Sequence, residues 1–303
     1  MKERLFTDTS DFIAIDYGDI ILIDEKRYRV VGHEREGRFG MEDDPKFWVK
    51  KVVDTESGEK KIIKLTHFES FETSLGGIKI KRFRNPDKEG EILNLVKNHP
   101  YFMHGTVHRD SKGNNIRVLD IVYGTNFFIY LASLEMDYET YFRTELPKIL
   151  KNIVRAFEAI RFLHINGHKH GDIRNDHIIV EKDTGNYVWI DFDYDYQSSE
   201  NPFAIDLFGL GNILIYAIGK GFHLHYAIND RSVYGDLIDR VETGDFSLLD
   251  KGRFLNLKKL YPAIPSTLND VLMHFSRGAN VYYEFVEEMI EDLNRCLYAF
   301  FEQ

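Results

Sequence analysis

The chain has 303 residues, of which 43% are hydrophobic and 29% are charged, a composition typical of a globular protein with a buried core. Its formal charge of −10 argues against a general nucleic-acid-binding protein, because binding to a phosphate backbone requires clustered Lys and Arg. A single cysteine, Cys296, excludes an internal disulfide, and no apolar run approaches the roughly 20 residues that span a bilayer. Because residues 1–4 also lack a following apolar signal segment, we expect a cytoplasmic protein without a membrane span.

Strand patterns dominate the chain up to about residue 132. Short apolar runs at 20–23 and 28–31 predict two strands joined by a turn. Residues 37–40 (Gly-Arg-Phe-Gly) are a glycine turn that lets backbone N–H groups approach phosphate oxygens, although ordinary turns have the same spacing. Residues 49–65 predict a strand, a hairpin turn and a second strand, and Lys64 interrupts the apolar end of the second strand.

A helix and a further hairpin complete this half of the chain. Residues 87–100 predict a helix with two carboxylates, Glu89 and Glu91, either of which could hold a buried lysine in place; Glu89 shares a face with Leu93. Residues 117–132 predict a hairpin around Gly124. The stretch 133–141 then separates the strand-rich half from a helical half.

Helical periodicity dominates after about residue 143. Apolar residues recur at helical spacing over 146–166, and Gly167 follows as a stop signal. A loop and a short hairpin come next, and further helices are predicted from 201–214 onward. Apolar faces at 268–275 and 285–301 predict core positions, including Phe285.

Two acids stand beside the hairpin that follows the long helix. Asp172 lies in the loop His170-Gly171-Asp172, and Asp191 ends the strand-like run 187–190. Phosphoryl transfer from ATP needs such a pair, because one carboxylate orients the acceptor hydroxyl and accepts its proton while the other holds a divalent metal against the phosphates. The nearby histidines also suggest zinc, but no cysteine accompanies them.

Taken in order, the glycine turn, the strand lysine, the helix glutamate and the two aspartates resemble the protein-kinase-like superfamily. The resemblance spans about residues 30–295 and is strongest over 146–215. It implies an α+β, bilobal protein-kinase-like fold. The N-lobe, residues 1–132, would be an antiparallel sheet with one helix, followed by a hinge at 133–141 and a mostly helical C-lobe at 142–303.

The resemblance also implies roles for single residues. Asp172 would align or deprotonate the acceptor hydroxyl, and Arg174 would neutralise the transferring phosphoryl group. Lys64, held by Glu89, would contact the ATP phosphates, and Asp191 would bind the metal. The further nucleotide contacts that it implies are Gly37, Gly40, Val49, Glu135, Met136 and Ile179.

The chain departs from the family at several positions. His177 stands where the family has an Asn that binds a second metal. Imidazole is a poor Mg²⁺ ligand but suits Mn²⁺, so either His177 binds an ion or the second metal is lost. Arg35 replaces the first glycine of the glycine loop, and about seven residues near 41–47 lengthen that loop. Phe192-Asp193 replaces the usual Phe-Gly, and the segment 192–205 is too short for a typical activation loop.

The function that follows is ATP-dependent transfer of a γ-phosphoryl group, with Mg²⁺ or Mn²⁺, to a Ser or Thr hydroxyl on a protein. Two alternatives stay open: a small-molecule phosphotransferase of the aminoglycoside or choline type, and a pseudokinase scaffold with little catalysis. AMP transfer is a further outcome that the sequence does not separate from phosphorylation. The oligomeric state is not determined by the sequence.

Overall fold

The computed structural model describes residues 3–36, 44–75, 78–198 and 201–301, and it shows an α+β protein. The chain divides into two compact units. Unit 1 comprises Met1–Glu69 and Phe83–Tyr123, and unit 2 comprises Ser70–Arg82 and Gly124–Gln303. The division after Tyr123 precedes the expected hinge at 133–141, which lies wholly within unit 2.

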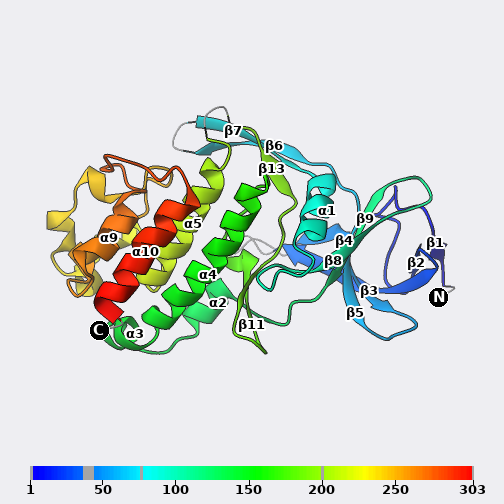
Figure 1. Ribbon diagram of the computed structural model, residues 1–303, viewed down its shortest axis with the longest axis horizontal. Helices are drawn as coiled ribbons and strands as arrows, with labels where there is room; N and C mark the ends of the chain where they lie inside the picture. The colour runs from blue at the N-terminus through cyan, green and yellow to red at the C-terminus, as the bar shows by residue number, and fades with distance from the viewer. Residues whose placement is uncertain (1–2, 37–43, 76–77, 199–200, 302–303) are drawn as a thin grey trace. The chain divides into compact units, whose positions relative to one another are not determined.

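Unit 1 is built on a seven-stranded sheet among the described residues (Figure 1). Its strands, in spatial order, are β1 (Leu5–Phe6), β2 (Ile20–Ile23), β3 (Lys26–Glu36), β4 (Asp44–Asp54), β5 (Lys60–Lys64), β9 (Asn115–Asp120) and β8 (Gly105–Arg109). All neighbours pair antiparallel except β1 and β2, which are parallel, so the expected antiparallel sheet is in fact mixed.

Local chemistry accounts for the hairpins of this sheet. The predicted turn between β2 and β3 places Asp24 and Glu25 at φ of 45° and 71°, the two positive values that a tight hairpin turn with the right twist requires. Alternating apolar residues then point to one side, where Val30, Val52 and Ile63 are buried in a common core. The strand–hairpin–strand predicted over 49–65 is confirmed as β4 and β5.

The helix of unit 1, α1 (Pro86–Leu95), is shorter than the predicted 87–100. Asn85 caps it, because its side chain accepts a hydrogen bond from the Lys88 backbone N–H at 3.0 Å, and Pro86 occupies the first turn, where no N–H is needed. The helix packs against β8. The capping fixes the first turn of α1, and Glu89 lies in that turn with its side chain buried.

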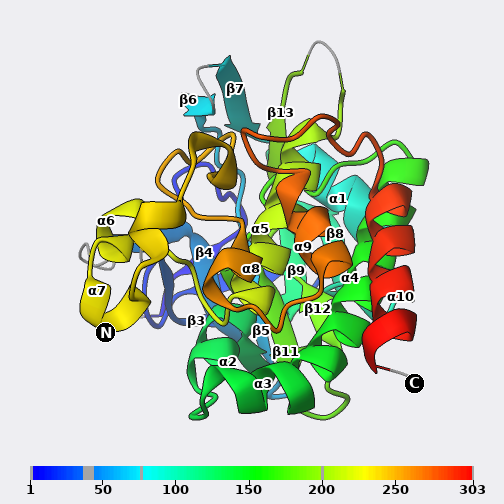
Figure 2. The same ribbon diagram turned by 90° about the vertical axis from the view of Figure 1, so that its left-hand side faces the viewer.

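Unit 2 is mostly helical (Figures 1 and 2). The predicted helix over 146–166 is confirmed as α4 (Leu146–Ile165), which packs along α10 (Val286–Phe301). Alongside lie α5 (Ala204–Ile218) and α9 (Ser266–Met273). The shorter helices are α2 (Phe127–Ala132), α3 (Tyr138–Thr144), α6 (His225–Ile228), α7 (Arg231–Tyr234) and α8 (Leu257–Leu260). Within the described ranges, no helix is long and apolar enough to cross a membrane.

Two small sheets complete unit 2. One has the order β10 (Gly124–Asn126), β11 (Ile178–Glu181) and β12 (Tyr187–Trp189). The other has the order β13 (Tyr194–Tyr196), β7 (Ile78–Arg84) and β6 (Ser70–Leu75). The indole N–H of Trp189 donates to the Ala156 carbonyl at 2.9 Å, so the strand that leads to Asp191 is attached to α4.

Two local predictions were wrong. Residues 127–132 form α2 rather than the second strand of a hairpin, because the Asn126 side chain caps the helix by accepting from the Ile129 N–H at 2.9 Å. The aromatic and β-branched residues of this run favour a strand, and the cap overrides that preference. Phe285 is 56% exposed rather than buried, since α10 begins one residue later, at Val286.

Candidate active site

The loop that contains Asp172 is fixed by a buried carboxylate on α5. Asp206, in the first turn of α5, accepts hydrogen bonds from the backbone N–H groups of His170 (2.7 Å) and Gly171 (2.9 Å) and contacts His164 Nε2 at 3.1 Å. Burial alone would raise the pKa of this carboxyl, but the His164 bond and the loop N–H groups outweigh burial and lower it. Asp206 therefore caps the backbone of this loop.

Close packing holds the same loop from a second side. Gly209 of α5 lies against Ile173, and a Cβ at this position would stand 2.6 Å from the Ile173 Cβ and 3.0 Å from its carbonyl oxygen. A glycine is needed here because any side chain would push the loop away from α5. The residue after Asp172 thus has little freedom to move.

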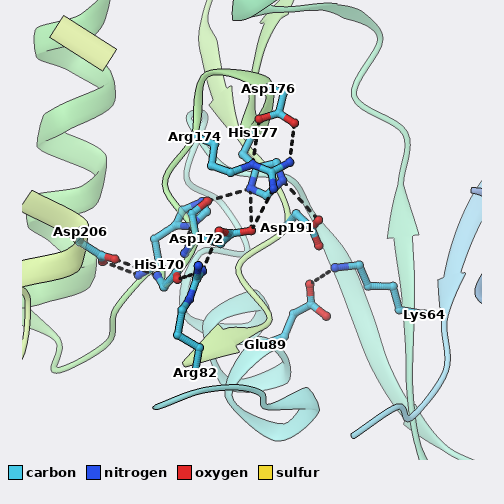
Figure 3. A network of polar contacts seen from close by, with 11 residues as sticks. Lys64, Arg82, Glu89, His170, Asp172, Arg174, Asp176, His177, Asp191 and Asp206 are labelled. Atoms are coloured by element: carbon cyan, nitrogen blue, oxygen red, sulfur yellow. Dashed lines mark hydrogen bonds and ion pairs between the residues drawn. The ribbon is translucent and has the colours of Figure 1, made fainter. Parts of the chain in front are cut away.

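The Asp172 carboxylate is almost buried and is surrounded by cationic groups (Figure 3). Arg82 donates to Oδ1 at 2.7 Å, while Oδ2 lies 3.5 Å from His177 Nδ1 and 4.0 Å from Arg174 Nη1. Burial by itself would raise the pKa of Asp172, but His177, Arg82 and Arg174 together hold that pKa below its ordinary value. Asp172 is therefore ionised at neutral pH, the state that accepts a hydrogen bond from a hydroxyl.

Arg174 has a second acidic partner that the sequence did not reveal. Its Nε and Nη2 atoms bind the two oxygens of Asp176 at 3.0 and 2.5 Å. This bidentate pair holds the guanidinium plane in one orientation near Asp172. This pairing limits the movement of the Arg174 side chain. The role expected for Arg174 in phosphoryl transfer stays a prediction.

His177 and Asp191 face one another across a short distance (Figure 3). His177 Nδ1 lies 2.7 Å from the Asp172 backbone carbonyl, which can only accept, so Nδ1 carries the hydrogen. The other nitrogen, Nε2, lies 3.6 Å from Asp191 Oδ2. With Nδ1 donating to that carbonyl, Nε2 is the ring nitrogen nearest the Asp191 carboxylate, so these two residues could hold a metal ion together.

Asp191 has an unusual backbone conformation. Its φ is 62°, in the left-handed region, which costs a residue with a Cβ about 1 kcal/mol or more. Backbone strain of this kind concentrates at functional sites, because it aims a side chain that a relaxed backbone would not. The next acid, Asp193, is 1% exposed, so it is a buried residue and not a solvated turn acid.

The donor set of these two residues fits a divalent ion held jointly with a phosphate. Mg²⁺ and Mn²⁺ accept carboxylate oxygen, Mn²⁺ accepts imidazole as well, and both leave positions for substrate oxygens and water. Within the described part of the chain, no three His, Cys, Asp or Glu side chains gather into a metal centre made by protein alone. An ion held by these two residues would take its remaining ligands from water or from a bound molecule.

Unit 1 contains a second charged cluster, on the sheet and α1. Lys64 Nζ donates to Glu89 Oε1 at 2.7 Å, and both side chains are buried. The predicted pairing of the strand lysine with Glu89 is therefore present. The other carboxylate oxygen, Oε2, accepts from Arg117 Nε at 3.0 Å. Lys64 and Arg117 stand directly opposite each other on β5 and β9. Glu89 thus neutralises two cations that would otherwise repel each other across the strands.

The remaining predicted nucleotide contacts have different surroundings. Val49 is buried on β4, opposite Lys64. Ile179 is half-buried on β11. Glu135 is exposed, and the Met136 carbonyl accepts from Lys220 Nζ at 2.5 Å. Gly37 and Gly40 lie outside the described residues.

Sequence reasoning missed Arg82 and Arg117. Arg117 could have been found from the sequence, because it is a cation inside an apolar strand and stands opposite Lys64 when β5 and β9 are paired. Arg82 had none, because 90 residues separate it from Asp172. Only the folded chain brings these two together.

Comparison with models of known protein families finds no match, and none of the curated proteins compared matches this chain.

Proposed function

We propose that this protein is an ATP-dependent phosphotransferase of the protein-kinase-like type, in which unit 1 corresponds to the nucleotide-binding lobe and unit 2 to the catalytic lobe. The observation that carries the proposal is the arrangement in unit 2. There, a braced loop presents an ionised Asp172 beside the facing pair His177 and Asp191. An aligning carboxylate next to a metal-binding pair is what phosphoryl transfer from ATP requires.

In the proposed reaction Asp172 accepts a hydrogen bond from the acceptor hydroxyl. The hydroxyl oxygen forms a bond to the γ-phosphorus, the bond from that phosphorus to the β–γ bridging oxygen breaks, and ADP leaves with the bonding electrons. The hydroxyl proton passes to Asp172. Because the pKa of Asp172 is lowered, we expect it to align the hydroxyl first and to take the proton late.

Asp191 and His177 would hold the divalent ion, Mg²⁺ or Mn²⁺. When bound, such an ion supplies positive charge that neutralises the phosphate oxygens. The left-handed backbone at Asp191 aims its carboxylate, and the hydrogen bond from His177 Nδ1 to the Asp172 carbonyl fixes the imidazole. Together these residues set the ligand orientation before any substrate binds.

Lys64 would bind the ATP phosphates. The Glu89 carboxylate holds its ammonium in one position on β5, and Arg117 holds the carboxylate in turn. The fixed ammonium is suited to a triphosphate because little side-chain entropy is lost on binding.

For adenine we propose backbone contacts in residues 121–123 rather than at Glu135 and Met136. Residues 121–123 follow β9, the neighbour of the lysine strand β5, within unit 1. Val49, the expected cover for the ring, stands opposite Lys64 in the same sheet. The Met136 carbonyl is already bound by Lys220.

We further propose a Ser or Thr hydroxyl on a protein as the acceptor. This narrower assignment rests on the glycine turn at 37–40 and on the helix that begins near Asp206, which favour the protein-kinase branch of the superfamily. A cytoplasmic location is proposed because the sequence contains a single cysteine, Cys296, and its thiol is buried.

The test incubates the purified protein with γ-labelled ATP and, separately, with α-labelled ATP, in Mg²⁺ or Mn²⁺, with a general protein acceptor such as casein. We expect label transfer from the γ position only. Asp172→Asn and Asp191→Asn should each lower the rate by roughly 10²- to 10⁴-fold when assayed at a temperature at which both variants are folded. Transfer from the α position alone would replace phosphorylation by AMP transfer. ATP-dependent thermal stabilisation without any transfer would favour a binding scaffold.

A further inference from the structure

A hairpin from the N-terminal half of the chain is built into unit 2. The strands β6 and β7 lie in sequence between the lysine strand β5 and α1, yet Ser70–Arg82 belongs to unit 2. There β7 pairs with β13, the strand that follows Asp191 and Asp193, and the Gln197 N–H donates to the Lys81 carbonyl at 3.4 Å. Figure 1 shows this three-stranded sheet. The hairpin therefore delivers its last residues to the neighbourhood of the Asp172 loop.

Arg82, near the end of β7, makes the contact. One nitrogen, Nη2, donates to Asp172 Oδ1 at 2.7 Å and to the Gly171 carbonyl at 2.9 Å (Figure 3). The guanidinium also lies over two aromatic rings of the same small sheet, with its Cζ 5.8 Å from the Phe71 centroid and 5.2 Å from the Tyr194 centroid. Because the Arg82 side chain is only 17% exposed, it is held in one orientation rather than moving as a surface charge.

These contacts make the two oxygens of Asp172 unequal. Oδ1 is bound by Arg82, whereas the nitrogens of His177 and Arg174 lie 3.5 and 4.0 Å from Oδ2, at ion-pair rather than hydrogen-bond distance. The terminal torsion of an aspartate is soft, so a carboxylate without such a bond samples a broad range of orientations. A bond from Arg82 to one oxygen, together with its bond to the Gly171 carbonyl, fixes that torsion.

We propose that Arg82 is a positioning residue for the transfer reaction: it orients the Asp172 carboxylate so that Oδ2 receives the acceptor hydroxyl and then its proton. This inference rests on the proposed function. It assigns to the β6–β7 hairpin a part in catalysis that acts only through Asp172. The role fits an arginine better than a lysine, because the planar guanidinium places one nitrogen against both the carboxylate and the carbonyl while its Cζ lies over the two rings.

The experiment measures kcat and KM for ATP in the γ-label assay for the wild type, Arg82→Ala and Arg82→Lys. The matched control is Lys79→Ala, which removes a cation from the same strand at a side chain that is 81% exposed. We expect Arg82→Ala to lower kcat roughly tenfold to a hundredfold with KM for ATP within about twofold, because misalignment of a catalytic group affects the chemical step. Arg82→Lys should lie between Arg82→Ala and the wild type, and Lys79→Ala should match the wild type.

Two readouts separate positioning from a merely structural role. First, guanidinium chloride at millimolar concentration should restore part of the kcat of Arg82→Ala, whereas urea at the same concentration should not. Second, Arg82→Ala should cause little further loss in an Asp172→Asn background, since its effect passes through that carboxylate.

The inference is overturned if Arg82→Ala keeps the wild-type kcat, or if its loss multiplies fully with that of Asp172→Asn. It is also overturned if the loss follows a lowered melting temperature without rescue by guanidinium. A wild-type protein that transfers no γ-phosphate would instead remove the proposed function, so the two failures are distinguishable.

Discussion

The buried carboxylate of Glu89 holds two cations, so its replacement should destabilise unit 1 strongly. Its oxygens accept from Lys64 Nζ at 2.7 Å and from Arg117 Nε at 3.0 Å, and Glu89 is fully buried. Glu89→Gln keeps the size of the side chain but removes its charge, and the amide nitrogen can only donate. One cation then loses its acceptor, and two positive charges remain opposite each other. Because breaking a buried ion pair typically costs 3–5 kcal/mol, we expect a loss of about 4 kcal/mol in the free energy of unfolding.

Urea unfolding followed by tryptophan fluorescence measures this effect, since the sequence has two tryptophans, Trp48 in unit 1 and Trp189 in unit 2. A Trp189→Phe background leaves Trp48, which packs against the unit 1 core, as the reporter. The matched control is Glu91→Gln, two residues further along α1 on an exposed side chain, with an expected change below about 0.5 kcal/mol. Equal effects of Glu89→Gln and Glu91→Gln would refute the reasoning.

Three further predictions concern single residues. Burial disfavours the charged ammonium of Lys50 and lowers its pKa to about 8 from 10.5. Lys50 therefore destabilises the folded state most below about pH 8, and this destabilisation disappears as the pH rises toward 10.5. The Lys50 contribution to the free energy of unfolding should thus rise by about 2 kcal/mol between pH 7.5 and 9.5, and urea titrations of Lys50→Met should lack this rise. Gly209→Ala should destabilise unit 2 by about 1–2 kcal/mol in chemical unfolding and should slow phosphoryl transfer, because the new methyl group collides with Ile173. Unchanged stability would show that the Asp172 loop does not pack closely against α5. Asp191→Ala should be about 1 kcal/mol less stable than Asp191→Gly, because only glycine tolerates φ of 62° without strain; equal melting temperatures would show that the backbone relaxes.

Much of the site could be predicted from sequence where the signal is local. The caps, turns and apolar periodicity around Asp172, Asp191 and Asp206 are contained in short windows, and the elements formed as expected. The Lys64–Glu89 pair spans 25 residues; it could be expected because a buried ammonium needs a carboxylate and because the resemblance places that carboxylate at Glu89. The other inferences use chemistry that acts over a few residues.

The rest depended on pairing between distant segments. The strands β6 and β7 belong to unit 2 because β7 pairs with β13, and no sequence signal within residues 70–84 predicts this pairing. Residues 127–132 were expected to form a strand because their aromatic residues favour one, but the Asn126 cap begins a helix there.

We propose that ATP binding depends on Lys64 of unit 1 and, through a metal ion, on Asp191 of unit 2. Calorimetric titration of the wild type, Lys64→Met and Asp191→Asn with ATP, in the presence and absence of Mn²⁺, tests it most directly. We predict one site whose affinity falls about tenfold or more in each variant, with the gain from Mn²⁺ retained in Lys64→Met and absent in Asp191→Asn. Equal ATP affinity and equal Mn²⁺ dependence in all three proteins would contradict the account.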